Sequence, residues 1–429
     1  MGRRGLVVLT DSYPYDWGEE FFEQEIGYLA SVFDRIWIVP VRVEEGAEPT
    51  RTLPDNATAL LLPRRRIRSW QAEALARAPQ ILLGPDRMVE TSPLRSFGRF
   101  GMDVRFASNA LSVKSRFLKV FPFDELADVD SVVVYSYWFF TGTALAGMVR
   151  KEIEKQCPST IVSRAHAYDI DEDAAPRQYI PSRRFVMGAA DRVFPISDYA
   201  AGFLARRFPD RMSKVSVQRL GVPRAVFRER RGGDPFTLVS CSHMAVYKRV
   251  DLLVRAVAEL ERRGVPVEWT HIGEADPGRL TAMRELADRE IHTSKVTFTG
   301  HLSNAEVRDL YATSDLSAFV NCSDGEGVPV SVMEAQSTGL PVVATAAGGT
   351  GEIVWDGRNG RLIPVDVTPG QIADAIESIR NLTADEYAEY SACARETWSV
   401  RSDAERQYDE FAALLSSAAD RVASHKRQA

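Results

Sequence analysis

Two glutamates, Glu326 and Glu334, stand eight positions apart on either side of a predicted helix start. Pro329 suits the first turn of a helix, because its missing N–H would have no partner there, and Gly339 suits the far end, because it can adopt a positive φ. The spacing therefore predicts Glu326 in the loop at the helix mouth and Glu334 about one and a half turns inside the helix. Because unpaired N–H groups at such a mouth attract anions, the segment predicts an anion-binding site.

The same segment resembles the signature of glycosyltransferase family 4, the group 1 retaining, nucleotide-sugar-dependent enzymes of GT-B fold. A bare pair of glutamates at this spacing occurs by chance in most proteins, whereas the four matching stretches together rarely do. They are Gly325-Glu326-Gly327-Val328-Pro329, Met333-Glu334-Ala335, Gly339-Leu340-Pro341-Val342-Val343 and Gly348-Gly349-Thr350-Gly351-Glu352. The alternative is a surface loop that caps a helix in an ordinary α/β protein.

The resemblance implies a role for each matched residue. Glu326 would face the transferred sugar, and Glu334 would accept hydrogen bonds from the ribose hydroxyls of the donor. The helix mouth would hold the donor through four consecutive residues, Gly327, Val328, Pro329 and Val330. A weaker match places Gly273 in a nucleotide-facing turn, although a glycine after a strand is more often a plain turn.

A lysine further toward the N-terminus completes the match to the donor site. Family members usually carry a Gly-Arg pair here followed by Lys-Gly, and the arginine and lysine hold the diphosphate of the donor. In this chain Lys248 matches, His243 stands at the arginine position and Arg249 replaces the glycine. Fixed cations stabilise the charge that develops on a departing diphosphate. Lys248 is therefore expected to act in catalysis and His243 and Arg249 in donor binding, whereas the alternative for Lys248 is a solvated helix-start lysine.

Two segments of the N-terminal half match the acceptor side of the same family. His166 follows a predicted strand directly, and the carboxyl ends of strands are where open α/β sheets bind ligands. It matches the active-site histidine, although a histidine taken alone at such a place would more often be a core residue. Gly18 and Glu19 lie in a loop that resembles the one approaching the acceptor and the donor phosphates, and Gly18 would let the backbone come close to a ligand.

Apolar runs alternate with helix-like stretches in both halves of the 429-residue chain, which indicates an α/β protein with doubly wound parallel sheets. The runs are Gly5–Thr10, Arg35–Val41, Ser131–Tyr137, Thr160–Ala165, Arg192–Ile196, Lys214–Leu220, Phe236–Ser240, Val267–Ile272, Lys295–Phe298, Leu316–Val320 and Pro341–Thr345. They predict two Rossmann-like domains, residues 1–222 and 236–399, which face across a cleft. The domains are joined near residues 223–235, a segment that contains the polar stretch Arg228–Asp234. The resemblance implies an acceptor-side first domain, a nucleotide-sugar-binding second domain, and a last helix, 400–425, that crosses back to the first.

Charge and hydropathy bear on partners and location. The net charge of −6 gives no reason to expect nucleic acid. The block Arg64–Lys119 differs, because it holds twelve Lys and Arg against four Asp and Glu, interleaved with aromatic residues. Such a block suits an anionic membrane surface, and a solvated surface insertion is an equal alternative. The uncharged run Ser131–Val149 fits a buried strand, loop and helix start better than a transmembrane span. We therefore expect a cytoplasmic protein, either free or peripheral on the inner face of the membrane.

No metal site is expected, because the four cysteines lie far apart and two short Asp-x-Asp matches are of the kind that chance produces. No cofactor is expected beyond a nucleotide-diphosphate sugar as co-substrate. The resemblance implies a retaining glycosyltransferase of hexosyltransferase type, which moves a sugar to a saccharide or lipid-linked saccharide in surface polysaccharide or glycoconjugate assembly. Two alternatives stay open: a GT-B nucleotide-sugar epimerase or hydrolase, and a non-catalytic protein that binds sugar nucleotides.

Overall fold

The computed structural model describes residues 2–15, 18–65, 69–226 and 235–428. The chain divides into two compact units: an N-terminal unit, Met1–Gln218 with Tyr408–Ala429, and a C-terminal unit, Arg219–Gln407. The polar stretch Arg228–Asp234 of the predicted linker lies outside the described residues, as do Arg66 and Arg68 of the basic block.

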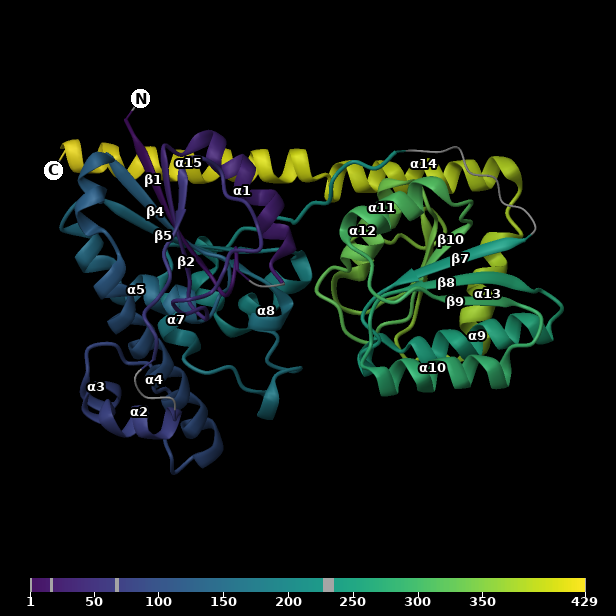
Figure 1. Ribbon diagram of the computed structural model, residues 1–429, viewed down its shortest axis with the longest axis horizontal. Coiled ribbons are helices and arrows are strands. Elements are labelled where there is room, and N and C mark those ends of the chain that lie inside the picture. The colour runs from purple at the N-terminus through teal and green to yellow at the C-terminus, as the bar shows by residue number, and fades with distance from the viewer. Residues whose placement is uncertain (1, 16–17, 66–68, 227–234, 429) are drawn as a thin grey trace. The chain divides into compact units, whose positions relative to one another are not determined.

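The N-terminal unit is built on a parallel sheet with the strand order β3-β2-β1-β4-β5-β6 (Figure 1). Its strands are β1 (Arg4–Thr10), β2 (Arg35–Pro40), β3 (Ala57–Ala59), β4 (Ser131–Ser136), β5 (Ser159–Ala165) and β6 (Arg192–Pro195). Its α-helices are α1 (Glu20–Val32), α2 (Trp70–Ala76), α3 (Ala78–Leu83), α4 (Phe97–Val120), α5 (Thr141–Glu154), α6 (Ala167–Ile170), α7 (Arg183–Ala189) and α8 (Asp198–Arg207). Short 3-10 helices lie at η1 (Phe123–Asp128), η2 (Pro176–Gln178) and η3 (Pro209–Lys214).

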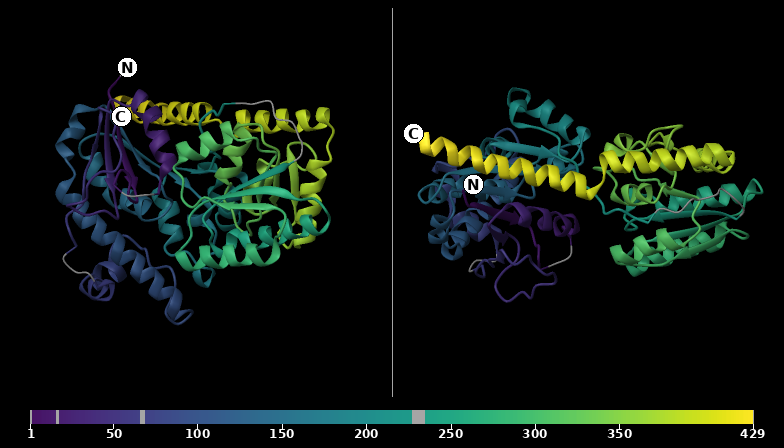
Figure 2. Two further views of the ribbon diagram at one scale, coloured as in Figure 1. Left: turned by 45° about the vertical axis from the view of Figure 1, so that its right-hand side comes forward. Right: turned by 90° about the horizontal axis from the view of Figure 1, so that it is seen from above.

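Both faces of this sheet are covered, as the unbroken apolar strands predicted. Successive side chains of a strand point to opposite faces, so Leu6 and Val8 of β1 pack in one core while Val7 and Leu9 pack in another. The last helix, α15 (Ala404–Gln428), covers the first of these faces beside α1, as Figures 1 and 2 show. Its Phe411 belongs to the same core as Leu6 and Val8.

A buried ion pair lies under α15. Arg164 of β5 and Glu25 of α1 are both fully buried, and Nη2 of Arg164 lies 2.9 Å from Oε2 of Glu25. The hydroxyl of Tyr135 donates to Glu25 over 2.8 Å, and the guanidinium of Arg164 lies 4.0 Å from the ring centre of Phe411. Because each charge is paired and hydrogen-bonded, the pair can be kept away from water, and it ties β5 to α1 and α15.

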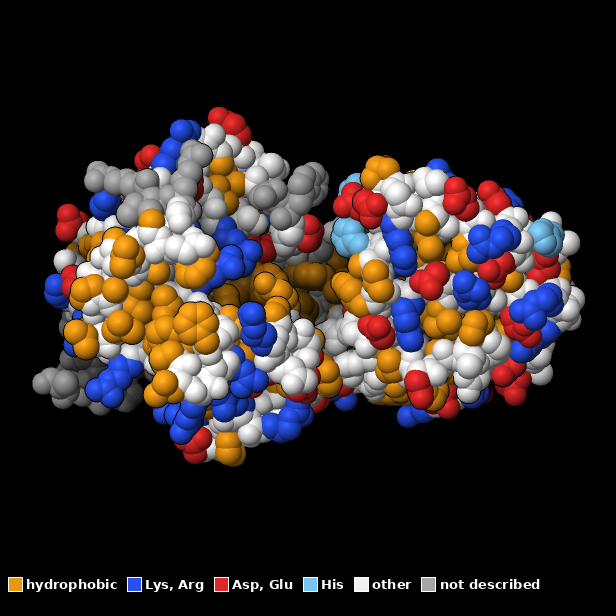
Figure 3. Space-filling view, turned by 90° about the horizontal axis from the view of Figure 1, so that it is seen from below, with side chains coloured by type: hydrophobic (Ala, Val, Ile, Leu, Met, Phe, Trp, Pro, Cys, Tyr) orange, Lys and Arg blue, Asp and Glu red, His pale blue; other side chains and the backbone are white. Residues whose placement is uncertain are grey.

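The described residues of the block Arg64–Lys119 form α2, α3 and nearly all of α4, with connecting loops. Several of its large hydrophobic side chains are exposed, among them Leu75, Leu83, Leu94 and Phe97. Figure 3 looks at this lower side of the N-terminal unit and shows hydrophobic side chains gathered there, with Lys and Arg side chains at their edges. The block therefore combines exposed apolar and basic groups on one side of its unit.

Two predictions for the N-terminal sheet were wrong. Lys214–Leu220 is not a strand. Val215 forms one isolated β-bridge with Val193, and the residues after it make only isolated backbone hydrogen bonds to β6. An apolar sequence pattern cannot show whether a segment forms the continuous backbone hydrogen bonds with a neighbour that define a β-strand. The short edge strand β3 was missed, because three residues are too few to show a period of two.

The C-terminal unit repeats the architecture, with a parallel sheet in the order β12-β11-β10-β7-β8-β9. Its strands are β7 (Phe236–Cys241), β8 (Val267–Ile272), β9 (Lys295–Phe298), β10 (Ala318–Asn321), β11 (Val342–Thr345) and β12 (Gly360–Ile363). Its helices are α9 (Val250–Arg262), α10 (Pro277–Glu290), α11 (Asn304–Thr313), α12 (Val330–Ser337), α13 (Pro369–Arg380) and α14 (Ala384–Arg401), with 3-10 helices η4 (Val246–Lys248) and η5 (Gly348–Glu352). The prediction missed the edge strand β12.

The predicted strand and helix start within Ser131–Val149 are confirmed as β4 and the beginning of α5. Across the described ranges, none of the helices combines the length and apolar character needed to span a membrane.

Candidate functional site

Three loops meet at the mouth of α12 because of the strand order. β10 pairs in parallel with both β7 and β11, so the carboxyl ends of these strands lie side by side at one edge of the C-terminal sheet. The loop after β7 carries Lys248, the loop after β10 carries Glu326, and the turn after β11 carries Gly348 and Gly349. The sheet thus brings together residues that are distant in sequence.

The helix begins one residue later than the sequence predicted. Pro329 is the N-cap of α12, with φ −72° and ψ 115°, rather than a residue of the first turn. Its ring fixes φ at a helical value, but ψ is extended, and its carbonyl accepts from the N–H groups of Val332 and Met333. Gly339 ends the segment at φ +80°, as predicted.

The N–H groups at the mouth of α12 point to an anion site. Among the described residues, no hydrogen-bond acceptor lies at the N–H groups of Val330 and Ser331, and no side chain caps the helix. Val328 and Val330 are half-buried beside this mouth, while the carbonyl of Gly327 accepts from the N–H of Gly349 over 2.8 Å. Donors of this kind, aligned with the helix dipole, suit a phosphate group.

Lys248 and Glu326 form a close ion pair beside this mouth. Nζ of Lys248 lies 2.6 Å from Oε1 of Glu326, and the two side chains are only 16% and 9% exposed. The amide of Asn321 donates to the same carboxylate oxygen over 3.3 Å. Because removing one partner would leave an unpaired, poorly hydrated charge, each group depends on the other in the absence of a ligand.

The glycine pair after β11 is required by the backbone of the Glu326 loop. A Cβ at Gly348, which has φ +56°, would lie 1.7 Å from the carbonyl oxygen of Glu326, and one at Gly349 would lie 2.3 Å from that of Gly327. Only glycine permits this approach. The two glycines therefore help to position the loop that carries Glu326.

Glu334 lies inside α12, and its carboxyl group is an uncommon one. Burial raises its pKa to about 7, and Arg308 opposes the shift. The carboxyl group is close enough to Cys241 and Tyr311 to raise the pKa of both, although burial is the larger cause for each. A carboxyl group with a pKa near neutrality in a poorly hydrated place is characteristic of functional sites.

Arg249 has a structural role in this geometry. Its guanidinium donates to the carbonyls of Cys322 and Val365, each over 2.6 Å, and to that of Ser323 over 3.4 Å. Its backbone adopts φ +49°, in the left-handed region where the family usually has glycine. The guanidinium thus ties the loop after β10 to the segment after β12, and a contact of Arg249 with a donor stays a prediction.

His243 and Gly273 lie on neighbouring loops. His243 is 73% exposed, and its Nδ1 lies 3.7 Å from Oε1 of Glu274. Gly273 has φ +140°, and a Cβ there would lie 2.0 Å from the carbonyl oxygen of Ser242. Gly273 therefore lets the loops after β7 and β8 meet. Contacts of either residue with a donor stay predictions.

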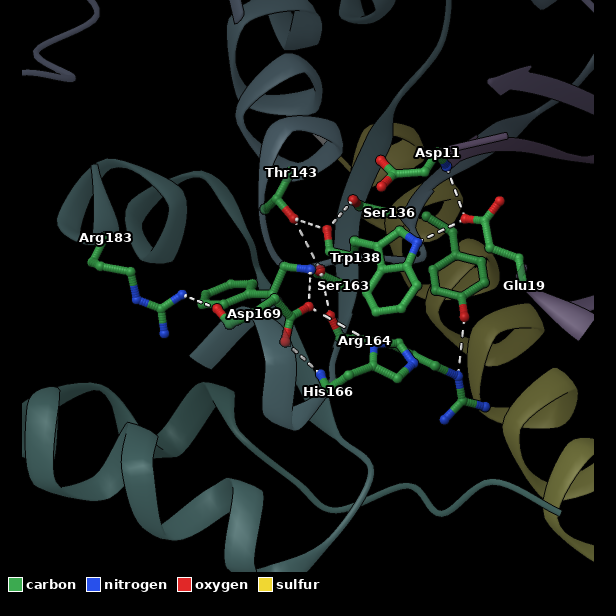
Figure 4. Close-up of polar contacts among 12 residues, drawn as sticks. Asp11, Glu19, Ser136, Trp138, Thr143, Ser163, Arg164, His166, Asp169 and Arg183 are labelled. Carbon is green, nitrogen blue, oxygen red and sulfur yellow. Dashed lines mark hydrogen bonds and ion pairs between the residues drawn. The ribbon is translucent and has the colours of Figure 1, made fainter. Parts of the chain in front are cut away.

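In the N-terminal unit, His166 is a buried imidazole without a hydrogen-bond partner. Within the described part of the chain, neither of its ring nitrogens is hydrogen-bonded, and Nδ1 lies 3.7 Å from Oδ2 of Asp169. Its ring centre lies 5.0 Å from that of Tyr137. It lies 4.4 Å from that of Trp138, and Figure 4 shows these two rings side by side. Because buried polar groups normally find a partner, His166 is a candidate to bind a ligand.

Asp169 holds this region in place. Its carboxylate accepts from the N–H of His166 over 2.6 Å and from that of Phe139 over 2.7 Å, and its carbonyl accepts from Arg183 over 2.6 Å (Figure 4). The prediction did not assign Asp169 a role. Its position three residues after His166 at a helix start was the available signal, since a carboxylate there can bond back to the N-cap N–H.

Glu19 organises its own loop. Its carboxylate accepts from the backbone N–H groups of Asp11, Ser12 and Tyr13 over 2.7–2.9 Å and from Nε1 of Trp138 over 2.7 Å (Figure 4). Gly18 has φ +95° and open space where a Cβ would stand, so its conformation, rather than a close neighbour, favours glycine. Contact of Gly18 or Glu19 with a ligand stays a prediction.

Asn321 of the C-terminal unit and Trp138 of the N-terminal unit are further residues that sequence reasoning missed, each within the candidate site of its own unit. Asn321 touches Glu326, and Trp138 joins Glu19 to His166. Neither stands in a matched motif, so only the fold identifies them. The described ranges contain no group of His, Cys, Asp or Glu side chains arranged to hold a metal ion.

Comparisons with known proteins find glycosyltransferases. Residues 235–381 match the family model of glycosyl transferases group 1. The putative colanic acid biosynthesis glycosyltransferase WcaL of Escherichia coli is 29% identical over 58% of this chain and 62% of its own length. A GDP-mannose-dependent alpha-(1-6)-phosphatidylinositol monomannoside mannosyltransferase of Mycolicibacterium smegmatis is 28% identical over 58% of this chain and 69% of its own length. Across eight curated relatives, the match covers between 30% and 69% of the relative's own length.

Solved structures show the fold. Anabaena Alr3699/HepE in complex with UDP and glucose matches with a TM-score of 0.63 at 15% identity, over 96% of this chain and 99% of that one. Sucrose-phosphate synthase from Thermosynechococcus elongatus matches with a TM-score of 0.65 at 15% identity, over 96% of this chain and 98% of that one. The predicted fold class, two Rossmann-like doubly wound domains of GT-B type, is confirmed, and so is the resemblance to group 1 glycosyltransferases. The narrower assignment to family 4 stays a prediction.

Proposed function

We propose that the chain is a retaining glycosyltransferase, which moves a sugar from a nucleoside-diphosphate donor to an acceptor hydroxyl in the assembly of a polysaccharide or glycoconjugate. The observation that carries the proposal is the arrangement at the mouth of α12. There the Lys248–Glu326 pair, at 2.6 Å, lies beside N–H groups without acceptors, and Glu334 lies behind them in the same helix. The names of the relatives support transfer, since they include glycosyltransferases of polysaccharide and glycolipid synthesis.

The donor would be held by complementary charges. Its diphosphate would lie at the helix mouth, where Lys248 and the free N–H groups of Val330 and Ser331 stabilise negative charge. The ribose hydroxyls would donate to Glu334. When the diphosphate draws Lys248 toward itself, Glu326 becomes free to interact with the transferred sugar.

Transfer with retention is proposed as a front-face attack. The bond between the anomeric carbon and the phosphate oxygen breaks, and its electron pair leaves with the nucleoside diphosphate. The acceptor oxygen bonds to the anomeric carbon on the same face, and its proton passes to the departing phosphate oxygen. The protein contributes position and charge stabilisation. His166, as a buried imidazole whose ring nitrogens make no hydrogen bond among the described residues, would bind a hydroxyl of the transferred sugar or of the acceptor.

The test is incubation of the enzyme with a panel of radiolabelled nucleotide sugars, with and without saccharide acceptors. A glycosyltransferase releases nucleoside diphosphate and forms a labelled product in proportion to the acceptor, and nuclear magnetic resonance of the product shows whether the anomeric configuration is kept. Release without an acceptor would identify a hydrolase or epimerase instead. Binding without any release would identify a sugar-nucleotide-binding protein.

We also propose that the face formed by α2, α3 and α4 attaches the protein to the cytoplasmic side of an anionic membrane. Exposed leucine and phenylalanine side chains lie there among basic residues, a combination typical of peripheral membrane surfaces (Figure 3). Each Lys or Arg near an anionic leaflet contributes about 1 kcal/mol, so a few of them are enough for reversible binding. A lipid-linked saccharide acceptor would fit this location.

A further inference from the structure

The N-terminal unit contains a cavity at the carboxyl end of its own sheet. Its volume is ≈ 730 Å³, and its lining residues all belong to this unit. Val41 follows β2, Phe140 precedes α5 and Tyr168 lies in α6, while α2 and α4 form the opposite wall. Doubly wound sheets bind ligands at this edge, and pockets of roughly 300–1,000 Å³ hold small molecules. The helices that close it belong to the block that no family motif matched.

The lining of this cavity is positively charged. Arg42, Arg65, Arg105 and Arg116 line it, against only two carboxylates, Glu44 and Glu73. Arg42 is paired with Asp11, which does not line the cavity. The guanidinium of Arg105 lies 5.9 Å from the ring centre of Trp70, and among the described residues it has no ion-pair partner. The wall of α2 and α4 therefore offers an aromatic face next to a cation.

Two buried polar atoms in this lining have no partner. Nε of Arg116 and Oγ of Ser108 are shielded from solvent, and within the described ranges neither has a hydrogen-bond partner. Arg116 does donate through Nη1 to Glu44 and to the carbonyl of Pro63, each over 3.3 Å. Unmatched buried polar groups are rare in folded proteins, so these two atoms are available to pair with a ligand that enters the cavity.

Arg65 and Arg116, both in the cavity lining, also repel each other. Burial lowers the pKa of Arg116, and the nearby charge of Arg65 lowers it further, while Glu44 and Glu73 oppose the shift. An anion between the two guanidiniums would remove this repulsion, and a planar guanidinium can bind a carboxylate or phosphate with two hydrogen bonds.

We propose that this cavity binds the acceptor through an anionic group, so that the acceptor is an acidic saccharide. Arg65, Arg105 and Arg116 would pair with its carboxylate or phosphate, and Trp70 and Tyr168 would pack against its sugar ring. The inference rests on the proposed transferase function. The anion has two sources, the carboxylate of a sugar acid or the phosphate of a sugar phosphate or lipid-linked saccharide.

The cavity wall leads to the candidate site of the N-terminal unit. The ring centre of Tyr168 lies 6.0 Å from that of Trp138, which lies 4.4 Å from that of His166. An acceptor anchored by the arginines would extend along these rings toward the unpartnered imidazole. The ring contacts therefore connect the cavity to His166 within the N-terminal unit.

The experiment measures binding of three matched probes to the full chain by calorimetry: glucuronic acid, glucose 1-phosphate and glucose. The variants are Arg105→Gln and Arg65→Gln, with Arg95→Gln as the control, because Arg95 is an exposed arginine of the same block that does not line the cavity. Lys248→Gln tests whether an anionic probe binds in the C-terminal unit instead. Hydrogen exchange with and without the probe locates the binding site.

Preference for glucuronic acid over glucose indicates a carboxylate site, and preference for glucose 1-phosphate indicates a phosphate site. In either case we expect Arg105→Gln and Arg65→Gln to weaken binding about tenfold or more, because each removes a charged hydrogen bond. Arg95→Gln should bind as the unaltered chain does. Exchange should slow in α2 and α4 of the unaltered chain and of Lys248→Gln alike, because any glucose 1-phosphate held at the mouth of α12 would not contact these helices.

Equal binding of glucose and the anionic probes, no binding of either anionic probe, or no effect of the cavity variants would overturn the inference. A chain that binds UDP and transfers sugar but fails these tests keeps its proposed function and loses only the anionic acceptor. A chain that binds the anionic probes in the cavity but releases no nucleoside diphosphate loses the proposed function instead.

Discussion

Replacing Glu334 with glutamine should stabilise the C-terminal unit at alkaline pH and weaken the binding of a nucleoside diphosphate. The folded-state pKa of Glu334 is about 7, against an ordinary value of 4.5. The folded protein therefore holds the proton more tightly than the unfolded chain, so this stability is fully present below pH 4.5 and is lost as the pH rises through about 7. At 1.36 kcal/mol per pKa unit, the loss has a ceiling of about 3 kcal/mol, because the side chain keeps some contact with water.

Glutamine cannot ionise, so the advantage of Glu334→Gln should grow with pH. We expect about 1 kcal/mol near pH ~5.5 and up to about 3 kcal/mol near pH ~8.5. Thermal melts at the two pH values measure this difference in stability. Each kcal/mol should shift the melting temperature by roughly 2–4 °C in a unit of this size. Loss of the ribose contact should weaken UDP binding about tenfold or more, which a smaller UDP-induced rise in melting temperature would show.

Glu306→Gln is the matched control. Hydrogen bonds from Ser303 lower the pKa of Glu306 at the start of α11, so this carboxylate adds stability above its unfolded pKa. The same substitution should therefore destabilise the protein at alkaline pH. If Glu334→Gln gave the same melting shift at both pH values, or a loss like that of Glu306→Gln, the buried and destabilising carboxylate inferred for Glu334 would be refuted.

Three further predictions concern catalysis and location. Lys248→Ala and Glu326→Ala should each cut transfer by at least roughly a hundredfold while the circular dichroism spectrum stays unchanged, and near-normal turnover in both would show that the site is misassigned. Transfer should survive EDTA, because the proposed mechanism stabilises charge with protein cations; complete loss that manganese restores would argue for a metal-dependent enzyme. Sedimentation with anionic vesicles should retain the protein, less so as salt rises toward 0.15 M, and Leu83→Ser with Phe97→Ser should reduce retention; equal binding to neutral vesicles would contradict this surface.

Several features of the molecule follow from residues that are close together in the sequence. Alternating apolar runs predicted most strands of both sheets, because a buried parallel strand needs a short β-branched run wherever it lies. The motif around Glu326 predicted a loop and helix, and Gly339 ends that helix with the positive φ that its residue type suggested. The edge strands β3 and β12 were missed, since three or four residues are too few to show a pattern.

The tertiary structure alone decided which of these residues meet. The sequence could name Lys248 and Glu326 as members of one site, but their ion pair exists because β7 and β10 are neighbours in the sheet and end at the same edge. The same strand order places Gly348 against the carbonyl of Glu326. The cavity lined by Arg65 and Arg116 likewise needs α4 to pack over the ends of the N-terminal strands. Local periodicity fixes elements, whereas contacts between distant residues depend on strand order and packing, which no local pattern encodes.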